Sequence, residues 1–393
     1  MTHALEASRP PTSVHREMGL LPTRASRAAT MTVDLVLGTR PEIIKLAPVA
    51  EALRRRKIGF RIIHTGQHYS HEMDRVFFDE LHVPRPSAFL EVGSGPHGAQ
   101  TGLMLQRLQR EFRESTPALV LVQGDTNTVL AGSLAAAKMD IPVGHVEAGL
   151  RCFDMGLVEE QNRVLTDHLS TLHFAPTRTS GFNLRREGIR GRHVSVTGNT
   201  IVDAVQSWLP RAASIGVRSP AEGAHDHAVA TLHRQENVDH RARLESMLCA
   251  LQRVGEKLKV QVILPLHPRT AARMKQWRLK GGSRVDVRSP VGYLSFLGLL
   301  GSAQIVLTDS GGVQEEACIL RVPCVTMRDS TERPESVHVG ANIVAGTSPE
   351  AIVRAAVKMA RRPRRWRNPF GDGKAGERIG DACSRFLSRR SGP

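Results

Sequence analysis

Short apolar and β-branched runs alternate with longer amphipathic stretches along the chain from Met31 onward. An apolar run of about five residues is typical of a strand buried on both faces, and the amphipathic stretches have the spacing of helices that cover such a sheet. This alternation predicts βαβ units and parallel sheets. The candidate strands form two series: first Thr32–Leu37, Arg61–His64, Ala118–Gln123, Pro142–Glu147, Leu172–Ala175 and His193–Thr197, then His227–Leu232, Val260–Pro265, Arg284–Arg288, Gln304–Thr308 and Pro323–Met327.

The stretch Leu209–His227 separates the two series and is rich in proline and glycine, so it is predicted to be a connector. Two Rossmann-like halves joined there would bind ligands in a cleft between the carboxyl ends of their sheets. We therefore expect an α/β fold of two Rossmann-like domains that face a central cleft. The predicted domains are 31–210 and 211–375, followed by a C-terminal helix and basic tail at 376–393. The last helix, about Gly373–Ser388, could pack on either half.

The composition restricts the class of protein. The chain has 393 residues, more than one hydrophobic core usually holds, and 40% of them are hydrophobic, so two globular domains are expected. No run approaches the roughly 20 apolar residues of a membrane-spanning helix. The five cysteines lie far apart without a CxxC pair, which is typical of free thiols in a reducing compartment. We therefore expect a cytoplasmic protein that makes no membrane contact.

The formal net charge of +16 raises the question of a nucleic acid partner. Much of the excess lies in residues 1–30 and in the tail, which includes Arg361–Arg367 and Arg385–Arg390. Because no aromatic pattern alternates with these charges, we expect no nucleic acid binding but a basic surface that attracts anionic substrates. Residues 1–30 are expected to be a disordered extension; a transit peptide and a start assigned upstream of Met31 would both explain them.

One segment combines a buried strand, two glycines and a helix start. Gln304–Thr308 is the strand, Asp309–Gly312 the turn, and Val313–Leu320 the expected helix. The glycines leave room for a phosphate, Ser310 offers a hydroxyl, and free N–H groups at a helix start attract an anion. The pair Glu315-Glu316 follows one turn later, where a carboxylate can accept hydrogen bonds from ribose hydroxyls. The segment predicts a nucleotide diphosphate site, although a capped helix would have the same pattern.

A second group of candidates lies where the first series of strands ends. Arg40 and Lys45 follow the first strand, at the start of a helix, where they could meet an anionic substrate. Asp125 and Glu147 follow two later strands, and Glu159 lies on the next predicted helix. Carboxylates gathered in a cleft raise the pKa of at least one of them, so they are natural acid and base candidates. Each alone could be a helix cap, and the prediction depends on the set.

Two histidines end strands of the second series. Because both strand ends face the inferred cleft, we favour a functional role for His233 and leave that of His267 open. The spacing of His68, His71 and Glu72 suggests a metal site only weakly, since no known spacing supplies a third ligand. We therefore expect no required metal. Neither a dinucleotide fingerprint nor a P-loop is present.

Taken together, these loops resemble one family, the non-hydrolysing UDP-N-acetylglucosamine 2-epimerases. The matching motifs keep their order from Met31 to the end of the chain. They are Gly38–Lys45, Thr65–His68, Gln123–Thr126, Gly144–Arg151, Glu159–Arg163, Thr197–Thr200, His233–Asn237, Thr308–Glu316 and Thr331–Glu335.

The resemblance implies a glycosyltransferase-B-type architecture, a homodimer without nicotinamide or metal, and interconversion of UDP-N-acetylglucosamine and UDP-N-acetylmannosamine for polysaccharide supply. C2 of the sugar is not next to a carbonyl, so its proton is too weakly acidic for simple removal and return. The family's route eliminates UDP across C1–C2 to give a 2-acetamidoglucal, and then adds UDP back while the proton reaches the opposite face of C2. Such a route needs a base, an acid and stabilisation of the leaving diphosphate.

The resemblance also implies roles for single residues. The catalytic set is Asp125, Glu147, Glu159 and His233, and the face of C2 that each carboxylate serves stays open. Arg163 would position Glu159 or the sugar. The groups implied around the diphosphate are Arg40, Lys45, His233, Ser310, Gly311, Gly312 and Arg333, with Glu316 on the ribose. The uracil would lie near the Val287–Phe296 loop and be read mainly by the backbone, with Phe296 among the substrate-binding residues.

A few positions depart from the family pattern. Val158 stands where proline commonly precedes the Glu-Glu pair, and Gln235 replaces the second arginine of the usual His-Arg-Arg-Glu-Asn. Gln67 and His68 match a pair that binds a second, activating substrate molecule in some members, and activation stays open here. The Glu147–Asp154 segment also resembles relatives that epimerise diacetamido-uronic acid sugars. A glycosyltransferase of the same architecture would share the fold, and a non-catalytic polyanion-binding protein would share the basic charge.

Overall fold

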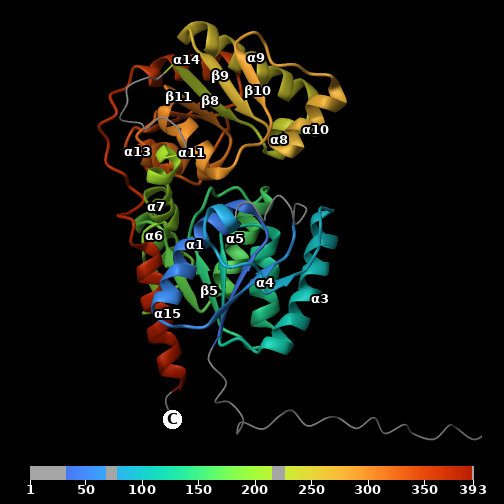
Figure 1. The fold of residues 1–393 in the computed structure, drawn as a ribbon, viewed down its shortest axis with the longest axis vertical. Helices are drawn as coiled ribbons and strands as arrows, with labels where there is room; N and C mark the ends of the chain where they lie inside the picture. Colours follow the sequence, from blue (N-terminus) through green and yellow to red (C-terminus); the bar gives the residue numbers. More distant parts are fainter. Residues whose placement is uncertain (1–31, 68–77, 215–225, 392–393) are drawn as a thin grey trace, which may run out of the picture. The chain divides into compact units, whose positions relative to one another are not determined.

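The apolar runs form two parallel sheets in the computed structural model, which describes residues 32–67, 78–214 and 226–391 (Figure 1). The first sheet has the order β3-β2-β1-β4-β5-β6-β7 and the second the order β10-β9-β8-β11-β12-β13. The strands are β1 Val33–Leu37, β2 Phe60–His64, β3 Ala88–Phe89, β4 Leu119–Gln123, β5 Val143–Val146, β6 Leu172–Ala175, β7 Val194–Val196, β8 His227–Thr231, β9 Gln261–Pro265, β10 Val285–Arg288, β11 Ile305–Thr308, β12 Cys324–Thr326 and β13 Asn342–Val344.

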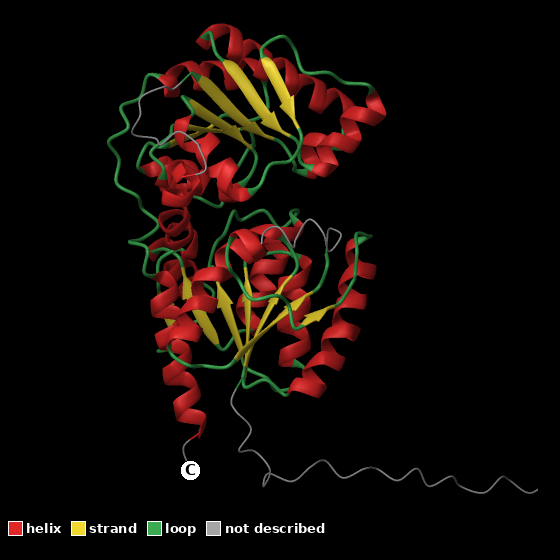
Figure 2. Ribbon diagram, viewed as in Figure 1, coloured by secondary structure: helices red, strands yellow, loops and turns green. Residues whose placement is uncertain are grey.

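Helices lie on both faces of each sheet, as parallel sheets require (Figure 2). The helices of the first half are α1 Arg40–Arg55, α3 His97–Ser115, α4 Asn127–Ala137, α5 Val158–Leu169, α6 Arg178–Arg186 and α7 Thr200–Ser214. Those after β8 are α8 Gln235–Val238, α9 Arg241–Leu258, α10 Pro268–Trp277, α11 Tyr293–Ser302, α12 Gly311–Ile319, α13 Pro334–His338, α14 Pro349–Ala360 and α15 Ala375–Ser391.

The pleat of the strands divides the core between these layers. Leu35 and Leu121 point to the face covered by α1, α7 and α15, whereas Val36 and Val120 point to the face covered by α3 and α4. The first of these clusters continues through α7 to α11, α12 and one face of the second sheet. Residues 31–393 accordingly form one compact unit.

The expected α/β fold of two Rossmann-like domains is confirmed, and the structure corrects some details. The short edge strands β3 and β13 were not predicted. The predicted connector begins too early, because α7 continues through Pro210 to Ser214. The last helix packs on the first half, where Nη2 of Arg56, the C-cap residue of α1, lies 2.6 Å from Asp381 of α15. The boundary at residue 210 stays a prediction, and the extension 1–30 lies outside the described residues.

The carboxyl ends of both sheets lead into the loops that carry the candidate residues. β1, β4 and β5 precede Arg40, Asp125 and Glu147, and β8 and β11 precede His233 and Ser310. Ion pairs connect loops of the first sheet to loops of the second, as between Lys45 and Glu315. Among the described helices, none is long and apolar enough to cross a membrane.

Candidate active site

Two strand ends of the first sheet carry the carboxylates at the centre of the site. β4 ends at Gln123 and β5 at Val146, and these residues are register partners. Asp125 and Glu147 follow them, so both carboxylates lie at the same edge. Glu147 has a backbone φ of 72°, a left-handed conformation that costs a non-glycine residue about 1 kcal/mol or more. Gln123 donates its side-chain amide to Glu147, which helps to hold this turn.

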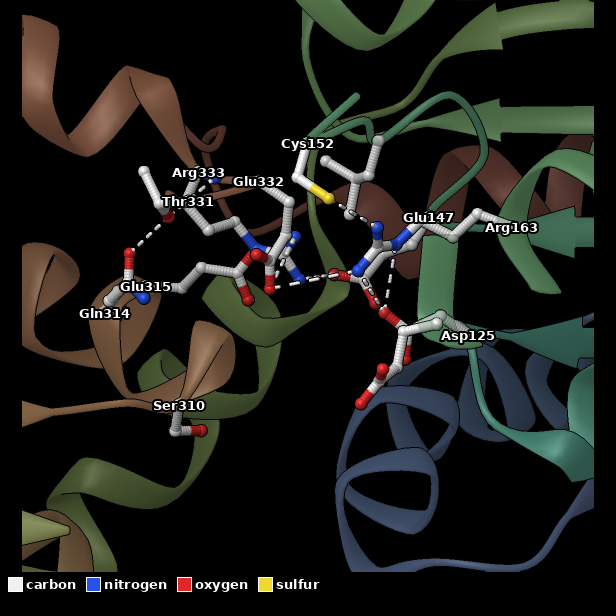
Figure 3. A network of polar contacts seen from close by, with 12 residues as sticks. Asp125, Glu147, Cys152, Arg163, Ser310, Gln314, Glu315, Thr331, Glu332 and Arg333 are labelled. Atoms are coloured by element: carbon white, nitrogen blue, oxygen red, sulfur yellow. Dashed lines mark hydrogen bonds and ion pairs between the residues drawn. The ribbon is translucent and has the colours of Figure 1, made fainter. Parts of the chain in front are cut away.

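Glu147 belongs to a buried cluster that joins the two sheets (Figure 3). Lys45 Nζ lies 2.6 Å from Glu147 Oε1 and 3.0 Å from Glu315 Oε2. Asn199 Nδ2 donates to the same two carboxylates, at 3.1 Å and 2.8 Å. Arg333 pairs with Glu315 and, at 3.4 Å, with Glu147. The negative charges of two carboxylates and the positive charges of two cations thus compensate one another inside the protein.

The surroundings shift the pKa values of the two carboxylates of this cluster in opposite directions. Burial would raise the pKa of Glu147, but Lys45 and then Arg333 outweigh it, so this pKa lies below its ordinary value. Burial raises the pKa of Glu315 above its ordinary value, and Arg333 and Lys45 offset only part of that effect. When one proton is shared within the cluster, it resides preferentially on Glu315.

Asp125 is half-buried and held by Arg163 of α5. Arg163 Nε and Nη2 donate to Asp125 Oδ2 at 3.0 Å and 2.8 Å, and its Nη1 donates to Glu160. Glu160 also accepts the backbone N–H of Cys152 at 3.1 Å, which fixes the loop after β5. Burial would raise the pKa of Asp125, but Arg163 and Arg234 hold it below its ordinary value. Asp125 is therefore an ionised group at neutral pH.

Glu159 lies beside the second sheet, where it pairs with Arg234. Arg234 Nη2 also lies 3.6 Å from Glu332 Oε1, and Glu332 accepts from Arg328 Nη1 at 3.0 Å. Glu332 is buried, which opposes ionisation, but Arg328 and other nearby arginines lower its pKa well below the ordinary value. Glu332 is thus a permanent anion between Arg163 and the arginines of the second sheet.

The glycine turn after β11 starts α12. Ser310 is the N-cap, whose hydroxyl accepts from Val313 N at 3.5 Å, and the helix begins at Gly311 rather than at Val313. A Cβ atom on Gly311 would overlap the Glu332 carboxylate, so this glycine makes room for protein. A Cβ on Gly312 would have its nearest neighbour at 3.9 Å, so there the space is open. Only Gly312 therefore matches the expected role of leaving room for a ligand.

His233 follows β8 and is locked by Asp309, the residue after β11. Its Nδ1 lies 2.9 Å from Asp309 Oδ1, and its backbone N–H donates to both oxygens of this carboxylate at 3.1 Å. Burial opposes ionisation of Asp309, but His233 and further donors lower its pKa to about 2. The ring centroid of His267 lies 5.6 Å from that of His233. Asp309 therefore orients a half-exposed imidazole at the edge of the second sheet.

The remaining predicted residues lie around this cluster. Arg40 is the first residue of α1. Glu316 is buried, which raises its pKa to about 7, while the Tyr293 hydroxyl beside it acts in the opposite direction. Phe296 lies in α11 rather than in a loop and packs against the core cluster that contains Tyr293.

The structure brings Asp125, Glu147, Lys45, Arg163 and Arg333 into one connected set of contacts. The sequence interpretation missed three further members. Asn199 and Glu332 occur in the quoted motifs but have no local pattern that shows where they point, and Glu315 had been grouped with the ribose site. The described residues contain no group of three or more His, Cys, Asp or Glu that could hold a metal. His68, His71 and Glu72 lie outside those residues.

Three comparisons bear on this arrangement. A family model for UDP-N-acetylglucosamine 2-epimerase matches residues 51–384. The UDP-N-acetylglucosamine 2-epimerase of Methanocaldococcus jannaschii is 50% identical over 357 residues, which are 89% of this chain and 98% of that protein. A crystal structure of the M. jannaschii UDP-GlcNAc 2-epimerase in complex with UDP-GlcNAc and UDP superposes with a TM-score of 0.86 at 49% identity, covering 91% of this chain and 100% of the other.

Two further proteins mark the range of the resemblance. The UDP-2,3-diacetamido-2,3-dideoxy-D-glucuronate 2-epimerase of Pseudomonas aeruginosa is 40% identical over 361 residues, covering 91% of this chain and 100% of that protein. The calicheamicin glycosyltransferase CalG4 superposes with a TM-score of 0.55 at 15% identity, over 93% of this chain and 100% of that one. This last likeness is one of fold alone, and it agrees with the expected glycosyltransferase-B-type architecture.

Proposed function

The chain belongs to the UDP-N-acetylglucosamine 2-epimerase family, and on this premise we propose that it interconverts UDP-N-acetylglucosamine and UDP-N-acetylmannosamine. The observation that carries the proposal is the buried cluster in which Glu147 meets Lys45 and Arg333, next to Asp125 and to the start of α12. It supplies strand-end carboxylates for proton transfer and cations for a departing diphosphate. The family expected from the sequence is confirmed.

The proton transfers are assigned to the carboxylates of the first sheet. Asp125 and Glu147 both have a pKa below the ordinary value, so each is ready to accept a proton from C2. The return step needs a proton donor on the opposite face of C2. A second, protonated group on that face supplies the proton, and the two groups exchange the roles of acid and base in the reverse direction. Glu159 is the third candidate for these roles.

The leaving diphosphate is assigned to the second sheet. Its oxygens would meet the N–H groups at the start of α12, the hydroxyl of Ser310 and the open space at Gly312. Lys45 and Arg333 now pair with Glu147 and Glu315, and an incoming diphosphate would compete for them. Arg40 and His233 are the other candidates around the diphosphate, Arg163 orients the carboxylates, and Glu316 is assigned to the ribose.

Deuterium incorporation tests this proposal. The protein is incubated with UDP-N-acetylglucosamine in deuterium oxide without any acceptor, and the sugar is followed by NMR. We expect deuterium at C2 together with the manno epimer, because the proton exchanges with solvent during elimination and return. Unchanged substrate over long times, at a protein concentration that binds UDP, would refute the epimerase assignment.

A second substrate follows from the 40% identity to the Pseudomonas aeruginosa enzyme. The same incubation with UDP-2,3-diacetamido-2,3-dideoxy-D-glucuronate decides between the two sugars, since exchange at C2 would be confined to the true substrate. A glycosyltransferase would exchange neither sugar at C2 and would instead release UDP only when an acceptor is added. The outcome thus separates the proposed activity from these two competing enzymatic activities.

Three broader expectations belong to the same proposal: a homodimer, a cytoplasmic location and supply of an activated sugar for polysaccharide synthesis. Light scattering of the purified protein measures the first, since a monomer corresponds to 43.1 kDa. A mass near that value at micromolar concentration would contradict the dimer without affecting the chemistry.

A further inference from the structure

A histidine inside the first sheet contacts two acceptors at once. His145 lies on β5, two residues before Glu147, and its side chain is fully buried. Its Nδ1 lies 2.7 Å from Asp167 Oδ1, and its Nε2 lies 2.8 Å from the carbonyl oxygen of Gly124. A carbonyl oxygen has no proton to give, so the hydrogen between it and Nε2 must come from the imidazole.

The same reasoning applies at the other ring nitrogen. Asp167 Oδ2 accepts from Gly149 N at 3.0 Å and pairs with Arg151 Nη2 at 2.7 Å, and both contacts favour the ionised form of this carboxylate. Burial opposes ionisation of Asp167, but His145 and Arg151 lower its pKa below the ordinary value. An ionised carboxylate cannot donate to Nδ1, and the hydrogen there also belongs to the ring.

We propose that His145 is held as a doubly protonated imidazolium and acts as a positioning residue for Asp125 and Glu147. The inference rests on the proposed function, because it gives those carboxylates their catalytic role. A neutral imidazole could donate to only one of the two acceptors and would leave two lone pairs facing each other across a buried contact. The ionised pair with Asp167 avoids that cost.

Other charged and titratable groups around His145 come from neighbouring elements. His173 on β6 contacts the backbone carbonyl of Asp167 through Nε2 at 2.7 Å. Burial lowers the pKa of His173, so this second ring is uncharged at neutral pH. Arg151 pairs with both Asp167 and Glu187, so Glu187 compensates part of the positive charge of Arg151. The carboxylate that balances His145 is therefore Asp167.

The imidazolium connects the two turns that carry the reactive carboxylates. Gly124, whose carbonyl it binds, directly precedes Asp125. Asp167, its other partner, holds Gly149 at the end of the turn that begins with Glu147. Glu147 has a φ of 72°, and a Cβ on Gly149 would overlap the Ser180 carbonyl, so this turn is both strained and closely packed against its surroundings. One charged group thus sets the positions of both turns.

Neutron diffraction of the deuterated protein at pH 7.5 tests the charge state without any assay of activity. We expect a deuteron on both Nδ1 and Nε2 of His145, and a deuteron on only one ring nitrogen of His173. A single deuteron on His145 would overturn the proposal. Because the measurement needs no substrate, it remains decisive even if the deuterium exchange experiment above gives no turnover.

The positioning role is tested with His145→Gln, which keeps an amide donor but no charge. We expect kcat to fall at least about 10-fold while KM and the affinity for UDP stay within about 3-fold, because the diphosphate site belongs to the other sheet. His173→Gln is the matched control, since His173 is also buried and also contacts Asp167 but does not touch Gly124. We expect its kcat to stay within about 2-fold of wild type.

Two results would contradict the positioning role. One is a His145→Gln variant with the kcat of the wild type. The other is a pair of variants in which kcat, UDP affinity and melting temperature fall together and equally, since that is the behaviour of a residue needed only for folding.

Discussion

The carboxylates that follow β4 and β5 and the carboxylate pair of α12 are in opposite electrostatic states. At the carboxyl edge of the first sheet, Asp125 and Glu147 meet Arg163 and Lys45, which hold the pKa of each below its ordinary value. At the carboxyl edge of the second sheet, the Glu315-Glu316 pair of α12 has pKa values above the ordinary value because burial dominates. The strand-end carboxylates of the first sheet thus keep their charge for proton transfer, whereas the carboxylate pair of α12 is shifted towards the neutral form beside the proposed diphosphate site.

The largest effect is expected from neutralising the first edge. Asp125→Asn and Glu147→Gln should each lower turnover by about 10²- to 10⁴-fold, the usual scale for acid and base groups. UDP affinity, measured by calorimetry, should change little, because the diphosphate is assigned to the second edge. Asp381→Asn, an exposed partner of Arg56 on α15, is the control and should retain wild-type turnover. Wild-type rates in both active-site variants would refute the division between the edges.

The next effect concerns Lys45, the cation that both edges share. Lys45→Met leaves Glu147 and Glu315 buried with one cation fewer, so the free energy of unfolding at pH 8 should fall by about 3 kcal/mol in urea titrations. In wild type the lowered pKa keeps Glu147 ionised down to pH 5. Without Lys45, burial raises the pKa of Glu147, so the folded variant takes up a proton that the unfolded chain does not and gains stability as the pH falls from 8 to 5. The difference between wild type and variant should therefore narrow towards pH 5.

The matched control for this prediction is Arg253→Met, which removes the cation of an exposed ion pair with Glu350. It should cause no measurable change at either pH. If the loss of free energy of unfolding in Lys45→Met stays constant from pH 8 to pH 5, the lost contribution is packing rather than charge.

A smaller effect separates the two glycines of the second edge. Gly311→Ala should lower the melting temperature without any ligand, because its Cβ would overlap the Glu332 carboxylate. Gly312→Ala should leave the melting temperature unchanged but weaken UDP binding about 10-fold, roughly 1.4 kcal/mol. Thermal unfolding with and without UDP measures both. Unchanged UDP affinity in Gly312→Ala would mean that the phosphates bind elsewhere.

The smallest effect is a change in pH dependence. Since the pKa of Glu316 is about 7 in the folded chain and 4.5 ordinarily, only the folded state keeps the proton between these values. The free energy of unfolding therefore decreases as the pH rises through this window. Glu316→Gln should lose less stability than wild type between pH 6 and pH 7, by about 1 kcal/mol. The control is Glu245→Gln, at an exposed position. If the free energy of unfolding had the same pH dependence in Glu316→Gln and in wild type, the prediction would be contradicted.

The sequence predicts the sheets and the strand-end carboxylates for one physical reason. Buried parallel strands are continuous apolar runs, and residues after neighbouring parallel strands meet at one edge, so Asp125 and Glu147 could be placed together. The edge strands β3 and β13 were missed because two or three residues carry too little pattern. Asn199 and Glu332 were missed because their orientation depends on packing between segments more than 100 residues apart, as in the contact of Asn199 with Glu315. Local sequence contains no signal for such a contact.

The path of the chain has a mechanical consequence. It passes between the halves twice, once from α7 to β8 and once from α14 to α15, whose helix returns to pack on the first half. A body attached at one point can swivel in every direction, whereas a body attached at two points can turn only about the line that joins them. With two crossings, one half is less free to turn relative to the other than it would be with one. Cutting the chain at one crossing would free the swivel without separating the halves.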